Sequence, residues 1–594
     1  MATTGIGAEA APTMRIDPQA LLWILVAFSV LTLNAPADLW GTIDHLRVPD
    51  TDDAMRLVGV RDLLAGQGWY DNVQYRFLPP DGVQSHWSRL VDAPIAGLIL
   101  LLGPLLGRSL AEGLAAVLWP LLLLGLFCLM VHRGVRRSFG PRAAVLAVFV
   151  ATQAFGIIVQ FQAGRVDHHN LQIIAMFGLA LCMIRGGLRP SLLGGALAAA
   201  SLAIGLEAVP YIALAGLFLA GEWILRGRAA LPGFLGFGLG LGLAVVPLFV
   251  GQTAPALWGT TYCDALSPPW LWLAGGGLAS ALVCACADRH LASARARLGL
   301  AAACGALLLG GFAALFPACL RGPFPGMTPL VREHWLYTVN EMASVPKFLA
   351  AGQWEILAFY PVLVLAAGTA TWLAFDGPER RIFRIAALFL WPGAVLGFFQ
   401  LRGIYVAVGF VPLVAGPVID RILAAAPAMR GPRLWGAVAV GTGLISSTWT
   451  VLALLAGALT PTAANGRDPD GAIACHSDAA VAPLAALPAG TVLAPIFIGP
   501  SILLRTPHSV VAAPYHRAIP GLTAAIEGLG GSEADLRRQV AAHGIRYLVT
   551  CPARPGDDLQ AEPAFATRLT RGEVAAPWLE PVSLPGVLRV WRVR

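Results

Sequence analysis

Pro49-Asp50-Thr51-Asp52-Asp53 is a short acidic stretch in a chain that is otherwise strongly apolar. Two further polar stretches lie far from it along the chain, Gly164-Arg165-Val166-Asp167-His168-His169-Asn170 and Thr338-Val339-Asn340-Glu341. Long apolar runs separate the three stretches, so the fold depends on how these runs place them. We expect all three on the same side of a membrane, where their carboxylate and imidazole groups can meet.

The composition is typical of a membrane protein with many spans. Of the 594 residues, 57% are apolar and 13% are charged, and the mean hydropathy is +0.69, far from the soluble average. The net charge of +7 could suggest nucleic-acid binding, but the arginines gather in short loops between apolar runs, as the positive-inside rule requires. We therefore assign the basic balance to membrane topology and expect no nucleic-acid partner.

Apolar runs long enough to cross a bilayer occur about thirteen times. The first, Leu21 to Leu33, follows a polar stretch and lacks a small-residue cleavage site after it, which favours a membrane anchor over a cleaved signal peptide. The predicted spans cover about residues 20–37, 109–131, 143–160, 170–186, 190–206, 209–226, 232–251, 269–287, 297–316, 353–375, 383–400, 402–424 and 433–458.

Arginine-rich and arginine-poor loops alternate along the chain, and this alternation sets the orientation. The arginine-rich loops should be cytoplasmic, which puts the N-terminus inside and the C-terminus outside. The long external loops are then about 38–108 and 317–352. The apolar segment Pro94 to Gly107 cannot be a full span in this topology, because it would move Asp52 or Asp167 to the cytoplasmic side. We expect it to lie in the outer interface or to re-enter the membrane.

Residues 459–594 differ in composition from the apolar residues 1–458, since they carry Pro, Gly, charged residues and short runs rich in β-forming residues. The runs Gly490 to Ala494 and Arg546 to Thr550 predict strands, and the apolar spacing over Glu533 to His543 predicts a helix. We therefore expect a polytopic α-helical membrane domain over 1–458 and a small external α/β domain over 459–594.

Five of the nine cysteines lie in or next to predicted spans, where apolar packing explains them. Cys263, Cys319, Cys475 and Cys551 fall outside the membrane. An oxidising exterior would permit Cys475 to pair with Cys551, although the sequence does not fix the connectivity.

The acidic stretches indicate a site for a hard divalent cation. Such an ion prefers carboxylate oxygens, tolerates an imidazole and keeps open positions for a substrate phosphate. Asp52, Asp167 and His169 fit this description. A structural alternative is that Asp167 and its neighbours cap a helix, because Asp and Asn are favoured at helix starts. Three acidic sites on one predicted face favour the metal.

With these residues, the chain resembles the catalytic subunits of oligosaccharyltransferases, polyprenyl-phosphate-sugar glycosyltransferases with the GT-C fold. Asp50-Thr51-Asp52 matches the family's first acidic motif, and Asp53 is a neighbouring candidate. Asp167-His168-His169 is similar to the second motif in archaeal members, and Thr338-Val339-Asn340-Glu341 matches the motif in the long external loop after the ninth span. Glu333 is the alternative to Glu341. The resemblance implies about thirteen spans and an external C-terminal domain.

The resemblance also places donor and acceptor contacts. Arg402, near the outer end of a late span, stands where the family binds the lipid-linked pyrophosphate, because a guanidinium matches phosphate oxygens; an arginine at a membrane edge can also simply reach to the interface. Further candidates for donor phosphate are Arg56 and His168, and those for acceptor or sugar are His86, Trp87 and Tyr405, besides Glu333. Of these, Trp87 could equally belong to an interfacial aromatic belt.

The tail departs from the family pattern. Members that glycosylate the Asn of a sequon carry a W-W-D-Y-G signature in their C-terminal part, and no such run follows residue 459. The acceptor is therefore open, and a single-sugar GT-C transferase that modifies a lipid, lipopolysaccharide or other polysaccharide is an alternative. A transporter or flippase is another, but transporters place their charges inside spans, whereas these acidic groups lie at span mouths.

Together these features predict a glycosyltransferase in a bacterial or archaeal plasma membrane, with its active site facing the periplasm or exterior. It would move a sugar or oligosaccharide from a polyprenyl phosphate or pyrophosphate to a protein, lipid or polysaccharide acceptor. Mg²⁺ or Mn²⁺ held by Asp52, Asp167 and His169 would neutralise the leaving phosphate. Glu341 with Asp52 or Asp53 would orient or deprotonate the acceptor. Nothing in the sequence demands a partner subunit, so we expect a monomer to suffice.

Overall fold

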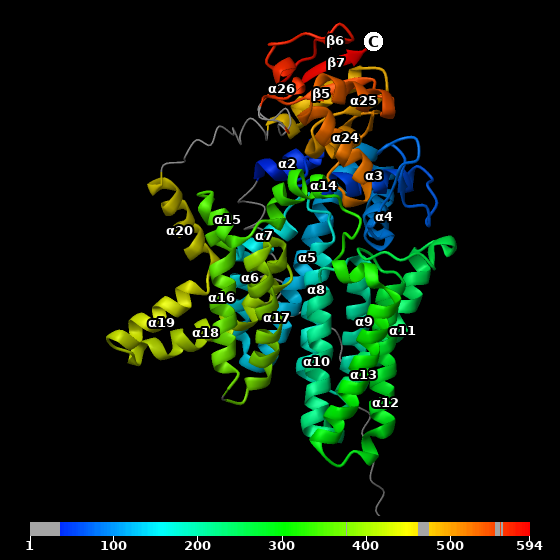
Figure 1. Ribbon diagram of the computed structural model, residues 1–594. Coiled ribbons are helices and arrows are strands. Elements are labelled where there is room, and N and C mark those ends of the chain that lie inside the picture. The colour runs from blue at the N-terminus through cyan, green and yellow to red at the C-terminus, as the bar shows by residue number, and fades with distance from the viewer. Residues whose placement is uncertain (1–35, 376, 461–473, 553–558, 560–561) are drawn as a thin grey trace, which may run out of the picture.

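The structure is a computed structural model that describes residues 36–375, 377–460, 474–552, 559 and 562–594. Its helices form a bundle in the lower part of Figure 1, and the C-terminal sheet with its helices lies at the upper end. Between these two parts lie elements of the external loops (Figure 1), among them α2 (Pro36–His45), α3 (Thr51–Leu64) and α14 (Pro329–His334).

Nine helical segments in the described residues are long and apolar enough to cross a membrane. They are α4 (Arg89–Leu106), α5 (Arg108–Phe139), α10 (Val209–Arg226) with the turn after it, α11 (Leu231–Gln252), α12 (Pro268–Ala287) with the turn after it, α13 (Ala294–Leu315), α16 (Ile356–Leu373), α17 (Arg380–Phe399), and Leu401–Ala428, which contains α18 (Val411–Ala425). The prediction of a multi-span helical membrane protein is confirmed at this level.

The individual spans differ from the sequence prediction in several places. The run 143–160 is two helices, α6 (Pro141–Gln153) and α7 (Phe155–Phe161), bent by 71°, and the run 433–458 is α19 (Pro432–Gly443) and α20 (Ser446–Leu459), bent by 85°. With each bent pair taken as one span, the described residues give up to eleven. The runs 170–186 and 190–206 are the 17-residue helices α8 (His169–Arg185) and α9 (Leu188–Ile204). The predicted first span, 20–37, lies almost wholly outside the described residues.

Helix α4 contains the segment Pro94 to Gly107, which the topology kept out of the set of spans. Its 18 residues have a hydropathy of 1.7, so length and composition alone would permit a crossing. In Figure 1 it lies below α3, near the end of the bundle that carries the C-terminal sheet. Buried Arg89 in its first turn donates to the carbonyl of Gly59 in α3 at 3.0 Å. The position of this helix in the membrane interface stays a prediction. It rests on the need to keep Asp52 and Asp167 on the same side of the membrane.

The residues after 474 carry a five-stranded mixed sheet in the order β4-β3-β5-β7-β6. β3 pairs in parallel with β4 and β5, while β7 runs antiparallel to β5 and β6. The predicted helix Glu533–His543 is α25, and the two predicted strand runs contain β3 and β5. The bounds are β3 (Thr491–Leu493), β4 (Ser509–Val510), β5 (Tyr547–Thr550), β6 (Leu579–Val582), β7 (Arg589–Val593), α22 (Asp478–Val481), α23 (Gly499–Arg505), α24 (Ile519–Gly530), α25 (Glu533–His543) and α26 (Phe565–Thr570).

This C-terminal part shares a core with the first external loop. One apolar cluster contains Val58 and Phe77 from that loop together with Val492, Ile502 and Val590 from the tail. The loop also carries a two-stranded sheet, β1 (Val73–Gln74) with β2 (Val83–Gln84), and the loop 317–352 carries α14 and α15 (Val345–Ala350). The tail is thus packed onto the loops that present the acidic stretches, and the domain boundary near residue 459 stays a prediction.

Two disulfides join the four cysteines expected outside the membrane. Cys475 pairs with Cys551, the pairing that the sequence allowed, and Cys263 pairs with Cys319. The other five cysteines are free. The second bridge ties the loop before α12 to the segment after α13, next to the site described below.

Candidate functional site

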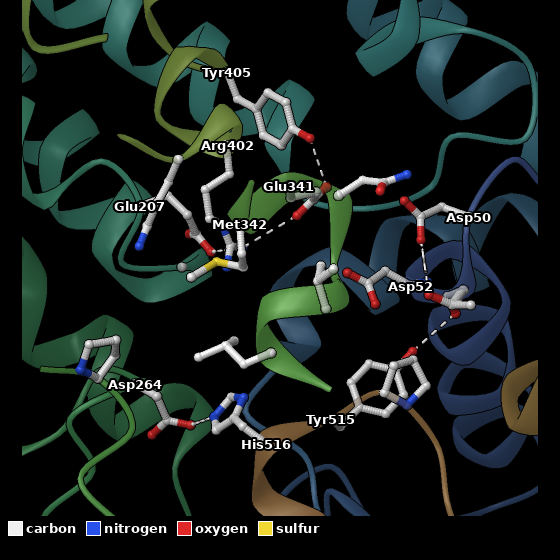
Figure 2. A pocket seen from close by; sticks show the side chains of 18 of the residues that line it. Asp50, Asp52, Glu207, Asp264, Glu341, Met342, Arg402, Tyr405, Tyr515 and His516 are labelled. Atoms are coloured by element: carbon white, nitrogen blue, oxygen red, sulfur yellow. Dashed lines mark hydrogen bonds and ion pairs between the residues drawn. The ribbon is translucent and has the colours of Figure 1, made fainter. Parts of the chain in front are cut away.

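Asp50 and Asp52 lie at the start of α3, where Asp50 caps the helix and Asp52 faces a cavity. Asp50 is the N-cap, with an extended backbone, and its carboxylate accepts a hydrogen bond from the backbone N–H of Asp52 at 3.2 Å. This is the usual way to satisfy a free N–H at a helix start. The Asp52 side chain points into a cavity (Figure 2). Burial and the charges of Asp50, Asp167 and Glu341 raise the pKa of Asp52 well above its usual range.

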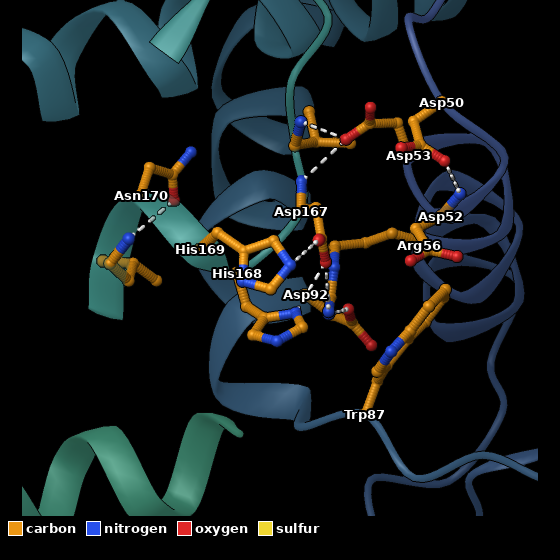
Figure 3. Close-up of polar contacts among 12 residues, drawn as sticks. Asp50, Asp52, Asp53, Arg56, Trp87, Asp92, Asp167, His168, His169 and Asn170 are labelled. Atoms are coloured by element: carbon orange, nitrogen blue, oxygen red, sulfur yellow. Dashed lines mark hydrogen bonds and ion pairs between the residues drawn. The ribbon is translucent and has the colours of Figure 1, made fainter. Parts of the chain in front are cut away.

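Asp53 faces the opposite way, into the protein, and is fully buried. Its carboxylate accepts hydrogen bonds from the backbone N–H groups of Val166 at 2.8 Å and Asp167 at 2.9 Å (Figure 3). It also accepts from Arg165 at 3.0 Å. The side chain therefore fastens the second acidic stretch onto α3. This geometry favours a positioning role for Asp53 over a catalytic one.

Asp167 is the centre of a buried charge cluster (Figure 3). Its Oδ1 accepts from His168 Nδ1 at 2.6 Å, and Arg56 lies 3.5 Å away. Its Oδ2 accepts no hydrogen bond in the described residues, although His169 Nε2 is 3.4 Å and Arg165 3.8 Å away. Burial would raise the pKa of Asp167, but His168, His169 and Arg165 outweigh it and hold that pKa well below its usual range.

The Asp167 cluster fits a divalent cation. Ligand atoms of Asp167, His168 and His169 all lie within 4.8 Å of one another. Asp167 Oδ2 is buried without a hydrogen-bond partner among the described residues, and the nearest partner of His168 Nε2 is Glu207 Oε2 at 3.4 Å, too long for a good hydrogen bond. A buried polar atom without a partner is costly unless something binds it. Of the three ligands expected from the sequence, Asp167 and His169 are in this group, whereas Asp52 lies across from it on the cavity wall.

A cavity of about 2670 Å³ joins the three acidic stretches. It is lined from the first external loop, from the ends of α9 and α10, from the loop 317–352, from the segment Leu396 to Val406, and from the tail. The sequence-predicted residues on its wall are Asp52, His86, Trp87, His168, Glu333, Glu341, Arg402 and Tyr405. Asp53, Arg56, Asp167 and His169 are buried behind this wall.

A chain of polar contacts crosses one side of the cavity (Figure 2). The hydroxyl of Tyr405 donates to Glu341 Oε1 at 2.8 Å, and Arg402 lies 4.0 Å from Glu341 Oε2 and 3.4 Å from Glu207 Oε1. The chain continues to His168 Nε2, 3.4 Å from Glu207 Oε2. Arg402 Nε is buried without a hydrogen-bond partner in the described residues, so this guanidinium can donate at least one more hydrogen bond.

Trp87 and Arg56 support the wall. The guanidinium of Arg56 is 4.8 Å from the centre of the Trp87 ring and binds Asp92 at 2.8 Å (Figure 3). Trp87 also packs edge-on against Tyr515 of the tail, with ring centres 5.3 Å apart. Arg56 is thus held by protein partners, away from the cavity where a donor phosphate would bind.

Sequence reasoning missed Glu207 and the contacts of Arg165. Glu207 is a lone acid in the short turn between the predicted spans 190–206 and 209–226. The predicted topology puts this turn on the outer face, so checking the short turns as well as the long loops would have found it. Arg165 stands two residues before Asp167, where a cation beside an acidic motif is a signal. Tyr515 stands in the polar and aromatic run Ala513 to Arg517 of the tail, which the sequence offers as a possible acceptor or sugar groove, and its hydroxyl donates to the carbonyl of Thr51 in α3 at 3.0 Å.

This bundle, with its external loops and C-terminal sheet around one cavity, has the fold of the membrane GT-C glycosyltransferases, as the sequence resemblance predicted. The oligosaccharyltransferase AglB of Archaeoglobus fulgidus, solved with an inhibitory peptide and a dolichol-phosphate, superposes with a TM-score of 0.64 and 14% identity, over 89% of this chain and 68% of that one. The same enzyme with Zn and sulfate gives 0.61 and 12%, over 89% and 67%.

A weaker likeness, with a TM-score of 0.41 and 15% identity, links 96% of this chain to 97% of ArnT from Cupriavidus metallidurans, solved with undecaprenyl phosphate. No protein-family model matches the sequence, and no curated protein matches it.

Proposed function

We propose that the protein transfers a sugar or oligosaccharide from a polyprenyl phosphate or pyrophosphate to an acceptor at the outer membrane face, with the help of a divalent metal. The observation that carries this proposal is the single cavity that Asp52, His168, Glu341 and Arg402 line together. These side chains come from four distant segments, and their chemistry is complementary to a phosphate leaving group and a hydroxyl or amide acceptor. The dolichol-phosphate and peptide bound to the archaeal enzyme support the assignment.

Arg402 is the proposed contact to the donor phosphate. Its guanidinium lies between Glu207 and Glu341 at 3.4 and 4.0 Å, distances that leave it only loosely held. A phosphate oxygen would give the buried Nε a partner and form a charge-assisted pair. The two glutamates keep the guanidinium at the cavity wall before the donor arrives.

Glu341 and Asp52 are the groups proposed to bind and orient the acceptor substrate. Tyr405 fixes one oxygen of Glu341, which leaves the other to accept from the acceptor's N–H or O–H group. Asp52 lies on the same cavity wall, where its carboxylate could accept a hydrogen bond from the incoming acceptor. Asp53 and Arg165 would hold the second acidic stretch in place.

Asp167 and His169, with His168 beside them and Asp52 on the cavity side, would hold the metal, for which Mg²⁺ and Mn²⁺ are the proposed ions. When bound, the ion supplies positive charge that stabilises the departing phosphate. The archaeal enzyme solved with Zn and sulfate supports a cation site in this fold. Arg56 and Arg165, at 3.5 and 3.8 Å from the carboxylate, would orient Asp167 for this role.

The proposed location is the plasma membrane of a bacterium or archaeon, with the cavity on the outside. Two disulfides lie on the same side of the molecule as the cavity, and such bonds persist in oxidising compartments. A monomer holds the complete cavity in the described residues, which supports function without a partner subunit.

The test is donor consumption by the purified protein from a pool of native lipid-linked sugars, in the presence of a cell-envelope extract that supplies protein, lipid and polysaccharide acceptors. Consumption that EDTA and Asp52→Asn abolish, and that Asp81→Asn leaves intact, would support the proposal. Asp81 is an exposed acid on the same external loop, so it controls for loss of charge alone. No consumption from a pool that a known transferase uses would reject the proposal in favour of transport.

A single-sugar transferase is the second candidate, and the sequence of the tail favours it. The sequon-binding signature is missing after residue 459, and the tail wall of the cavity carries Arg505, Tyr515 and His516 instead. Mass spectrometry of the acceptor decides between the candidates: one added sugar on a lipid or glycan indicates the single-sugar enzyme, and an oligosaccharide on protein indicates the other.

A further inference from the structure

His86, Asp264 and His516 meet on the cavity wall, away from the acidic stretches. His86 belongs to the first external loop, Asp264 to the loop between α11 and α12, and His516 to the tail. One ligand atom from each lies within 4.8 Å of the others. His516 Nε2 is 2.6 Å from Asp264 Oδ2 (Figure 2), and the two imidazole rings are 4.8 Å apart.

Each of the three side chains is held by its surroundings. Arg517 donates to both oxygens of Asp264, at 2.7 and 3.0 Å, and to the carbonyl of Ser85, the residue before His86, at 3.0 Å. The Phe324 ring packs against His516 at 4.4 Å. The disulfide of Cys263 fixes the residue before Asp264.

We propose that His86, Asp264 and His516 form a second metal site, which binds Zn²⁺ or a similar transition ion and joins the tail to two external loops at the cavity wall. This inference does not rest on the proposed transferase function. Two imidazoles and one carboxylate are a common ligand set for Zn²⁺, and such sites often keep a fourth position for water or substrate. Here the fourth position would face the cavity that all three residues line.

The geometry needs only a small contraction. A tetrahedral ion with bonds of about 2.1 Å separates its ligand atoms by roughly 3.4 Å, which is somewhat less than the 4.8 Å limit within which these atoms lie. Arg517 does not compete for the ion, because a carboxylate offers about four acceptor positions. An arginine bound to a ligating carboxylate instead fixes its orientation, as partners behind metal ligands generally do.

The alternative is that Asp264, His516 and Arg517 make only a hydrogen-bonded clamp between tail and loop. In that case His86 has no part in it, since its ring makes no hydrogen bond to Asp264, His516 or Arg517 in the described part of the chain. His86 is therefore the residue that separates the two interpretations.

The experiment counts the bound metal on the full-length protein in detergent. Metal-free protein is dialysed against Zn²⁺, bound zinc is measured by mass spectrometry, and Co²⁺ is titrated in parallel while its visible absorption is followed. Wild-type, His86→Gln and His334→Gln are compared, the last being a histidine on α14 outside the cluster. Asp167→Asn, measured in the same way, identifies any zinc bound at the catalytic cluster.

We expect His86→Gln to bind one zinc fewer than wild-type and to lose a Co²⁺ absorption band, while His334→Gln matches wild-type. Zinc should raise the melting temperature of Asp167→Asn, and it should raise that of His86→Gln less than that of wild-type. Equal zinc content in wild-type and His86→Gln, or zinc that only Asp167→Asn removes, would overturn the inference and leave the clamp. Donor consumption is scored separately, so the two proposals fail independently.

Discussion

At the scale of single residues, the neighbours Asp52 and Asp53 show how a helix divides one acidic motif. Successive residues on a helix point about 100° apart, so Asp52 faces the cavity while Asp53 faces the interior. We expect Asp52→Asn to lower the transfer rate by roughly 100- to 10,000-fold, the usual contribution of an acid–base group, with little change in melting temperature.

Asp53→Asn should do the reverse and destabilise the fold by about 1–3 kcal/mol, because the new amide NH₂ faces either Arg165 or the backbone N–H groups of Val166 and Asp167 in the interior, where only an acceptor fits. Thermal unfolding and donor consumption measured on both variants check the pair. If Asp53→Asn were as stable as wild-type but inactive, the catalytic role expected for Asp53 would return.

Tyr405 offers a second test at this scale. Tyr405→Phe removes the hydrogen bond to Glu341 and keeps the ring. Since a hydrogen bond to a charged group contributes about 1.5–3 kcal/mol, the transfer rate should fall by about 10- to 100-fold. Tyr337→Phe changes another tyrosine on the cavity wall and serves as the control. Equal transfer rates in the two variants would argue against a role of Glu341 in binding the acceptor substrate.

From the sequence, the residues that gather at the cavity were easier to predict than the contacts that each of them makes. The motifs around Asp52, Asp167 and Glu341 could be predicted because short polar stretches stand out between apolar runs. Whether His168 or His169 lines the cavity could not, since it depends on the turn of the chain at the start of α8. Glu207 joined the site only when α9 and α10 were placed in space.

At the scale of elements, α25 is where local signals were strongest. Ser532 accepts from the backbone N–H of Asp535 at 3.3 Å, and Asp535 reaches back to the backbone N–H of Ser532 at 2.9 Å, which completes a capping box. The sequence predicted the bounds of this helix, but it did not predict the breaks in the runs 143–160 and 433–458. Hydropathy reports how apolar a segment is, and a bend leaves that average unchanged.

We therefore expect Ser532→Ala to destabilise α25 by about 1 kcal/mol. Hydrogen exchange of the amides in the first turn of α25, followed in the full-length protein, measures the effect as roughly fivefold faster exchange where local opening dominates. Ser532→Thr keeps the hydroxyl and should restore most of the protection. Equal protection in the Ala and Thr variants would show that the cap contributes nothing.

At the scale of the whole molecule, the tail and the first external loop are joined by two arginines, one from each part, that donate to backbone carbonyls of the other part. Arg76 of the loop donates to the carbonyls of Leu503, Thr506 and His508 at the end of α23, between 2.7 and 3.1 Å. Arg505 of the tail donates to the carbonyls of His45 and Leu46 at the end of α2, at 2.9 and 3.0 Å. Sequence reasoning could not foresee this, because loop and tail are more than four hundred residues apart.

Arg76→Met tests whether this joint keeps the cavity closed. The variant leaves the three carbonyls at the end of α23 without their charged donor, and each such hydrogen bond contributes about 1.5–3 kcal/mol, so α23 and the strand pairing at Val510 should exchange hydrogen at least tenfold faster. Because Arg505 and Tyr515 line the cavity, a loosened tail should also weaken donor and acceptor binding, which raises KM more than it lowers kcat. Arg538→Met removes an exposed arginine from α25 and is the matched control. Faster exchange with unchanged kinetics would mean that the tail is attached to the site without shaping it, whereas unchanged exchange would mean that the shared apolar core alone holds the tail in place.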